Sequence, residues 1–410
     1  MWVSKIMRTA FFILSLSLFG QVSDTDLLNK VRLKVRENLT RLPNYTCIET
    51  IERAQRRKST DRFAISDTIR LEVAYVEGKE LFGWPGAEKI EEPDIRKFVR
   101  GAIGNGDFAI TPRNIFFTRS AAIHLAGEAE LEGKHAFRFE FSVPRSANVY
   151  TIERDLERDF VGLQGSFWVH SGTLDLIRIE SGAFDIPPKL GVVSSATTLT
   201  YGPVSIGSST FLLPQHSELV MSAANGFENR NRMTFHGCRQ FSGVSVLKFE
   251  EPTVEPAAAP PPRAVTTANL PDSFEVEMKL VSPIDSSTAA IGDSVRATIG
   301  QNIKSGRAIA IPKGAEVSCR IAVLEKRVNY YLMELQATSI DFEGGHVDLQ
   351  GRETRVAMIV FHNGRMVNAS PAFHPGPQIF RTDRLQLPRG TDFILRSRLL
   401  KSKDNDSIRP

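Results

Sequence analysis

The clearest pattern in the chain is a strict alternation of apolar and polar residues from Phe137 to Val143. A period of two is typical of a β-strand with one buried face. A second apolar run, Gly165–His170, is followed by the turn residues Ser171-Gly172 and by a third run, Leu174–Glu180. These segments predict adjacent antiparallel strands whose aromatic inner face needs a large cover.

An amphipathic helix is predicted ahead of these strands. Ser23-Asp-Thr-Asp26 is similar to a capping box, and Pro43 ends the helical pattern. Between them apolar residues recur three or four positions apart, at Leu28, Val31, Val35, Leu39 and Leu42. We expect this helix to cover the phenylalanine face, with a second, short helix beginning at Pro93.

Further short strands are expected on both sides of this central group. The segments are Tyr45–Ala54, Ile69–Tyr75, Leu81–Trp84, Ala196–Tyr201, Phe211–Leu213, Ser217–Met221, Met233–Arg239 and Val244–Phe249. Residues 24–250 are therefore predicted to form an α+β domain, in which a curved antiparallel sheet wraps a helix as a half-barrel.

The composition changes abruptly after residue 250. Glu251–Pro262 contains five prolines, which predicts an extended linker over residues 251–269. Beyond it, residues 270–400 alternate over many short segments, such as Phe274–Leu280, and predict an all-β barrel or sandwich. Residues 401–410 are expected to be a disordered tail.

The first 23 residues have the features of a secretory signal peptide. Lys5 and Arg8 precede the apolar run Ala10–Phe19, which is too short to span a bilayer. No later segment has the length and apolar character of a transmembrane helix. We therefore expect an exported protein, periplasmic or secreted.

Charge argues against one class of partner. The 51 basic residues nearly balance the 47 acidic ones, which leaves a net charge of +4 over 410 residues. Binding to nucleic acid requires a concentrated basic face, so nucleic acid is excluded as the main partner.

Catalytic and metal-binding patterns are weak. The histidines are scattered, and the glycines of Gly101-x-x-Gly104-x-Gly106 follow a predicted helix, so they indicate a connector. Four acids alternate with Arg154 and Arg158, which favours a solvated, ion-paired face over a Ca²⁺ site. These acids are Glu153, Asp155, Glu157 and Asp159. We predict no enzyme activity, no catalytic residue, no metal and no cofactor.

The three cysteines predict one disulfide in an exported protein. Cys47 lies in the first expected strand of the front domain and Cys238 near its end, whereas Cys319 lies in the second domain on an inward-facing position. We expect Cys47 and Cys238 to pair and Cys319 to be a buried small hydrophobe. A dyad of Cys238 with His236 is the alternative.

The order of these elements resembles known families. With its signal, N-terminal helix and consecutive strands including Trp168–Glu180, the segment 24–250 resembles the LolA/RseB-type half-barrel, a fold that leaves an apolar concavity. Leu42–Cys47 with Glu49–Arg53 resembles bacterial exported proteins of unknown function.

The second domain resembles the β-domain of TrbI-like conjugation-pore proteins. The resemblance is carried by Val281-Ser-Pro-Ile284, Gly292-Asp-Ser-Val295 and Ile309–Ala315. It implies a shared β fold.

The half-barrel resemblance implies a function in binding. An apolar or lipid-like ligand would lie in the concavity against Phe137, Phe139, Phe141, Phe167 and Val169. The alternative is a concavity filled by the helices, in an envelope assembly protein that contacts other proteins through its surface.

Overall fold

The computed structural model describes residues 23–87, 89–99, 101–104, 108, 110–154, 157–241, 270–349, 352–358, 360–362, 365–367 and 377–400. The predicted signal peptide up to residue 22, the proline-rich linker, the expected strand Val244–Phe249 and the C-terminal tail lie outside these residues.

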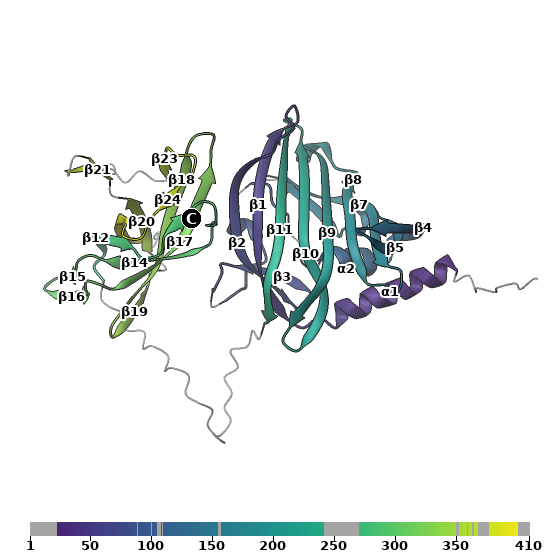
Figure 1. Ribbon diagram of the computed structural model, residues 1–410, viewed down its shortest axis with the longest axis horizontal. Helices are drawn as coiled ribbons and strands as arrows, with labels where there is room; N and C mark the ends of the chain where they lie inside the picture. The colour runs from purple at the N-terminus through teal and green to yellow at the C-terminus, as the bar shows by residue number, and fades with distance from the viewer. Residues whose placement is uncertain are drawn as a thin grey trace, which may run out of the picture.

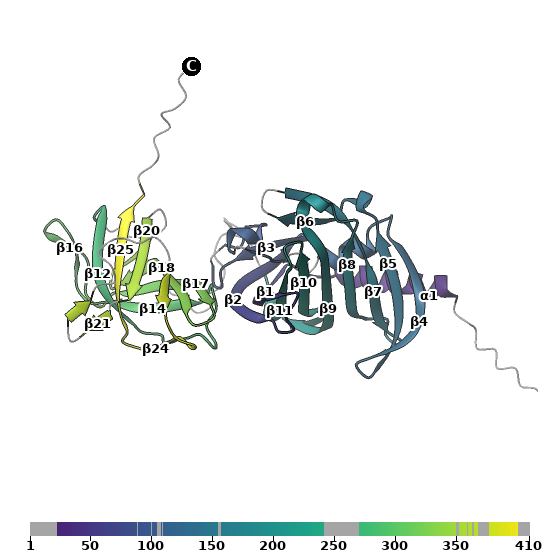
Figure 2. The same ribbon diagram turned by 90° about the horizontal axis from the view of Figure 1, so that it is seen from above.

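The front half is a large antiparallel sheet with strand order β4-β5-β7-β8-β9-β10-β11-β1-β2-β3 (Figures 1 and 2). A further strand, β6, pairs with β7 alone among the described residues. The bounds are β1 Tyr45–Arg57, β2 Ala64–Val76, β3 Lys79–Gly83, β4 Ala122–Leu131, β5 Lys134–Val143, β6 Tyr150–Arg154, β7 Glu157–His170, β8 Leu176–Phe184, β9 Val192–Ile206, β10 Ser209–Ala223 and β11 Phe227–Gln240.

Two α-helices occur in the described residues, α1 (Asp24–Thr40) and α2 (Ile110–Phe116). The side chain of Ser23 caps α1 by accepting a hydrogen bond from the Asp26 amide at 3.2 Å, as the sequence predicted. The described part of the chain also contains three short 3₁₀ turns, η1 (Ile95–Lys97), η2 (Arg145–Ala147) and η3 (Pro188–Leu190).

The predicted α+β half-barrel around a helix is wrong for this half of the chain, which is mostly β. Only Val31 and Val35 of the 17 residues of α1 are buried, and α1 lies at one end of the sheet beside β4 (Figure 1). So narrow an apolar stripe covers only a few strands. Strands and loops cover the rest of the sheet.

The second half contains a closed barrel, which confirms the predicted β-barrel. Six strands pair in the cycle β12-β14-β17-β18-β20-β25 and back to β12. Their bounds are β12 Ser273–Leu280, β14 Ser294–Ile299, β17 Glu316–Lys326, β18 Tyr331–Phe342, β20 Arg352–Met358 and β25 Asp392–Leu399. Closure pairs the edges that an open sheet would expose.

Shorter strands border the barrel. They are β13 Ile284–Asp285, β15 Ile303–Ser305, β16 Ala308–Ile311, β19 Gly345–Asp348, β21 Val360–His362, β22 Arg365–Val367, β23 Gln378–Phe380 and β24 Gln386–Leu387.

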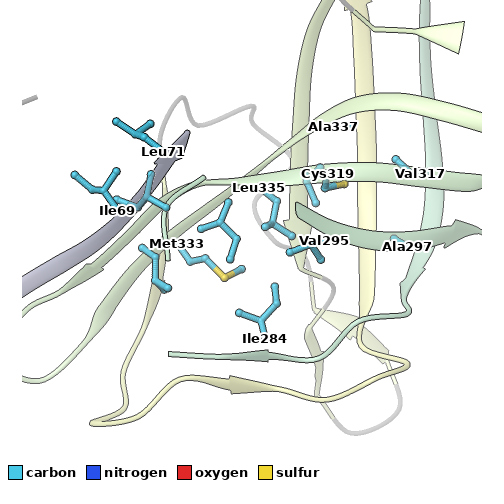
Figure 3. Packing of buried hydrophobic residues seen from close by; sticks show 14 of the residues in the cluster. Ile69, Leu71, Ile284, Val295, Ala297, Val317, Cys319, Met333, Leu335 and Ala337 are labelled. Atoms are coloured by element: carbon cyan, nitrogen blue, oxygen red, sulfur yellow. The ribbon is translucent and has the colours of Figure 1, made fainter. Parts of the chain in front are cut away.

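The barrel packs against the part of β2 that β3 leaves unpaired. The Arg70 amide donates to the Ile291 carbonyl at 2.7 Å, and the Ile291 amide donates to the Thr68 carbonyl at 2.8 Å. Figure 3 shows part of the continuous apolar cluster that contains both Ile69 of β2 and Met333 of β18. The barrel therefore covers the part of the β2 edge that β3 does not pair.

Cys47 and Cys238 form a disulfide between β1 and β11, which confirms the predicted pairing. Cys319 is free and buried. Its burial raises the pKa of the thiol to about 12, so the thiol is protonated and unreactive at neutral pH.

None of the helices in the described part of the chain has the length and apolar character needed to cross a bilayer.

Candidate functional site

The structure brings the predicted ligand residues together as a packed aromatic cluster. Phe139 stacks on Phe167 at a centroid distance of 5.0 Å, and Phe116 of α2 meets Phe167 edge-on at 4.9 Å. Phe139, Phe167 and Val169 are 0% exposed and Phe141 is 3% exposed, while Phe137 is partly buried against them. These side chains contribute to the core between the sheet and the two helices.

This cluster begins a row of directly opposed residues that crosses the inner face of the sheet. Each member faces the next across one strand pair, so all lie on the same side. The row runs Phe139, Phe167, Ile179, Leu199, Ser217, Met233, Ile51 and Ile69, from β5 to β2. All of its members are buried, and all but Ser217 are apolar.

The neighbouring row on the same face is made largely of small or polar residues. It runs Phe141, Gly165, Ser181, Thr197, Leu219, Asn231, Arg53 and Asp67. At Gly165 the neighbouring strand approaches closely, because an added β-carbon would collide with the Glu180 carbonyl oxygen. Two other members of the row, Thr197 on β9 and Leu219 on β10, border open space above the sheet.

Two adjoining cavities lie over the inner face of the sheet, under β6 and the loop that contains η1. The first has a volume of about 310 Å³ and the second a volume of about 510 Å³. Both lie within the range of about 300–1,000 Å³ typical of small-molecule sites. They share four lining residues, Arg96, Ile103, Glu153 and Met221.

An ion-pair cluster occupies the shared wall. The Arg96 guanidinium donates to Asp94 at 2.7 and 2.8 Å and also to Glu153 of β6. The bond from Arg96 lowers the pKa of the Asp94 carboxyl. The two carboxylates in turn raise the pKa of Arg96. The cluster joins the η1 loop to β6, and these two segments form the cover over the cavities.

A further bond holds this loop against the sheet. The buried Asn231 side chain donates to the Ala102 carbonyl at 3.0 Å. A cover bonded at both points is preorganised, which reduces the entropy that ligand binding would cost.

The first cavity is walled by buried apolar side chains. Ile95 from η1, Ile152 from β6 and Leu219 from β10 each expose less than 5% of their surface. Around them lie Tyr150, Thr151, Thr197 and Arg158. The first cavity therefore combines buried apolar side chains with charged and polar groups.

The second cavity is lined by carboxamides and an aromatic ring. Gln55 Nε2 donates to Asn229 Oδ1 at 3.2 Å between β1 and β11. Asn225 and Phe227 line the same cavity, and the guanidinium of Arg57 lies 4.9 Å from the centroid of the Phe227 ring.

The barrel carries a wider depression of about 990 Å³. It is lined by the turn Pro312–Glu316 and by the hairpin residues Asp341–Gly345. Turn residues supply few apolar contacts, so this depression lacks the buried apolar walls of the front cavities.

The predicted acidic segment forms ion pairs. Glu157 and Asp159 pair with Lys189 at 3.6 and 3.1 Å, and Glu153 belongs to the Arg96 cluster, while Asp155 lies outside the described residues. Within the described ranges, no group of three or more histidine, cysteine, aspartate or glutamate residues could hold a metal ion.

Sequence reasoning placed the ligand against the phenylalanine cluster of β5 and β7, and no member of that cluster lines either cavity. The walls of the first cavity include Ile95, Ile152, Thr197 and Leu219, which lie on separate elements and carry no joint signal in the sequence. The register of β9 on β10 brings Thr197 and Leu219 opposite each other.

No family model and no curated protein matches the chain. Among solved structures, a DUF1329 family protein from Desulfovibrio piger is 12% identical over 54% of this chain and 95% of its own length, with a TM-score of 0.29. An outer membrane lipoprotein-sorting protein domain from Vibrio parahaemolyticus is 11% identical over 52% and 92%, with a TM-score of 0.30. Similarity at this level assigns no function, and the TrbI-like resemblance stays a prediction.

Proposed function

We propose that the protein is an exported, non-enzymatic binding protein that holds an apolar or amphiphilic ligand in the two front cavities. The observation that carries this proposal is the pair of adjoining cavities on the inner face of the sheet, where buried apolar side chains meet charged and polar groups. Uncovered apolar surface costs about 25 cal/mol per Å² in water, which favours a ligand in such a site.

The side chains around the cavities support binding rather than catalysis. Their described lining contains no histidine, cysteine, lysine or serine, the residue types that most often act as nucleophile or general base. The carboxylates of Asp94 and Glu153 each form an ion pair with Arg96.

Export is supported by the sequence and by the disulfide. The first residues of the chain have the features of a signal peptide. The Cys47–Cys238 disulfide is of a kind that persists in oxidising compartments.

The test is a pair of substitutions on one strand. Thr197→Phe places a large ring on the side of β9 that lines the first cavity, and Thr198→Phe places the same ring on the opposite side. We expect Thr197→Phe to weaken the binding of a fluorescent fatty-acyl probe at least about tenfold and Thr198→Phe to leave it unchanged. Thermal unfolding of both variants checks that they remain folded, and Met221→Phe is the second variant if Thr197→Phe does not fold.

Two results would contradict the proposal. Unchanged binding in folded Thr197→Phe and Met221→Phe variants would place the ligand elsewhere, with the phenylalanine cluster as the first position to test. Absence of binding by the unsubstituted protein would leave the envelope interaction protein as the better hypothesis.

A further inference from the structure

The described lining of the two cavities carries more positive than negative side chains. The arginines are Arg96, Arg154 and Arg158, and the carboxylates are Asp94 and Glu153. An anionic group that enters the cavities therefore meets more cationic than anionic side chains, whereas a cationic group adds to the positive charge.

Arg158 is well placed to bind such an anionic group. Its Nε atom lies 3.9 Å from Glu153 Oε2, a distance that gives an ion pair but is too long for a hydrogen bond. Within the described residues its five N–H groups donate no hydrogen bond, so they remain available to a ligand. The Arg158 side chain is 64% exposed and also lines the first cavity, so it lies at the rim of that cavity.

Arg96 supplies further donors beside Arg158. Its guanidinium has five N–H groups and uses three of them on Asp94 and Glu153. One N–H group remains on each of its two terminal nitrogens. Arg96 and Arg158 both contact the carboxylate of Glu153, so their guanidinium groups lie near each other. A single carboxylate or phosphate group can therefore accept hydrogen bonds from both.

The position at the rim suits the head group of an amphiphile. A charged group at the rim stays in contact with water, so it does not incur the cost of full desolvation. An apolar chain attached to it meets the buried side chains Ile95, Ile152 and Leu219 of the first cavity. Val99 and Val192, which are also buried, continue the apolar lining in the second cavity.

We infer, on the basis of the proposed binding function, that the ligand is an amphiphile with an anionic head group, a carboxylate or a phosphate. Arg158 and Arg96 bind this head group at the rim of the first cavity, and the apolar chain lies in the two cavities. The chain supplies affinity through buried apolar surface, and the two arginines select the charge of the head group.

The experiment compares four ligands that share a decyl chain and differ in the head group, namely decanoate, decyl phosphate, decyl glucoside and decylammonium, each below its micelle concentration. Isothermal titration of the full mature chain should show at least one of the two anions binding about tenfold more tightly than the glucoside or the ammonium ion. The tighter of the two anions identifies the head group as a carboxylate or a phosphate.

Substitution of Arg158 tests the assigned site. Arg158→Ala should weaken the tighter anion about tenfold and leave decyl glucoside unchanged, and Arg158→Lys, which keeps the charge, should weaken that anion less. Arg232→Ala is the matched control and should change nothing. Arg232 is 53% exposed, pairs with the carboxylate of Glu218 and lies on the opposite face of the sheet. Thermal unfolding checks that the variants fold, and Arg158→Gln is the second variant if Arg158→Ala does not.

Each other outcome has a distinct meaning. If decyl glucoside binds as tightly as the anions and Arg158→Ala changes neither, the cavities accept an apolar chain without reading its charge, so the binding function stands and this inference falls. If decylammonium binds most tightly, the carboxylates dominate the site and the inference is wrong. If an anion binds most tightly but Arg158→Ala leaves its affinity unchanged, the assigned site is wrong. If none of the four ligands binds and the fatty-acyl probe also fails, the inference and the proposed function fall together.

Discussion

Phe139→Ala is the substitution that best separates the aromatic core from the ligand cavities. Phe139 is 0% exposed and stacks on Phe167. Removing a ring that buries about 200 Å² loses roughly 5 kcal/mol at about 25 cal/mol per Å². The retained methyl group and partial collapse of the site reduce this to about 4 kcal/mol, within the range of about 3–5 kcal/mol typical of a buried Phe→Ala change.

The free energy of unfolding is measured by guanidinium denaturation followed by far-ultraviolet circular dichroism. Phe160→Ala on β7 is the matched control, because Phe160 is 37% exposed and should cost less than about 1 kcal/mol. We expect Phe139→Ala to leave affinity for the fatty-acyl probe unchanged, since Phe139 does not line either cavity. A loss of affinity with a stability change below about 1 kcal/mol would refute this reasoning and return the ligand to the phenylalanine cluster.

Four further predictions concern other parts of the chain. Replacing both Cys47 and Cys238 by Ala removes a crosslink between residues 191 apart and should cost about 5 kcal/mol in the chain-entropy model. Equal denaturation midpoints of the oxidised wild type and this variant would contradict that. Gly292→Val should loosen the barrel from β2, because Gly292 has a φ of +101° and its added β-carbon would collide with the Arg70 carbonyl oxygen and lie 2.9 Å from Trp84. The rate of hydrogen exchange at the β2 amides should then rise. Unchanged protection of these amides would show that the contact tolerates a side chain. The lowered pKa of Asp94 contributes stability above the unfolded-state pKa that is lost as the pH falls below about 4. Asp94→Asn should therefore flatten the acid limb of the Tm profile, and a profile that keeps the wild-type slope counts against the ion pair. Limited proteolysis should cut first between Glu251 and Ala268, within the proline-rich segment, and leave two folded fragments; a uniform ladder would contradict the predicted two-domain division.

Local sequence signals determined many of the elements. The alternation from Phe137 to Val143 predicted β5, since neighbouring side chains of a strand point to opposite faces. Ser23 and Pro43 bracketed α1, because a capping side chain and a residue without an amide hydrogen act within one helical turn. The pairing of Cys47 with Cys238 followed from counting three cysteines in two predicted domains.

Tertiary structure alone decided what covers the sheet and where it is hollow. The helical pattern of α1 showed that one of its faces was apolar but not that only two of its residues would be buried, because the partner surface lies far away in sequence. Likewise, Thr197 and Leu219 are unremarkable along the chain and line one cavity together only after β9 and β10 pair in register. Register depends on contacts between distant segments. Closure of the barrel and its packing on β2 depend on similarly distant contacts, so period-two patterning predicts the strands but not the surfaces that they enclose.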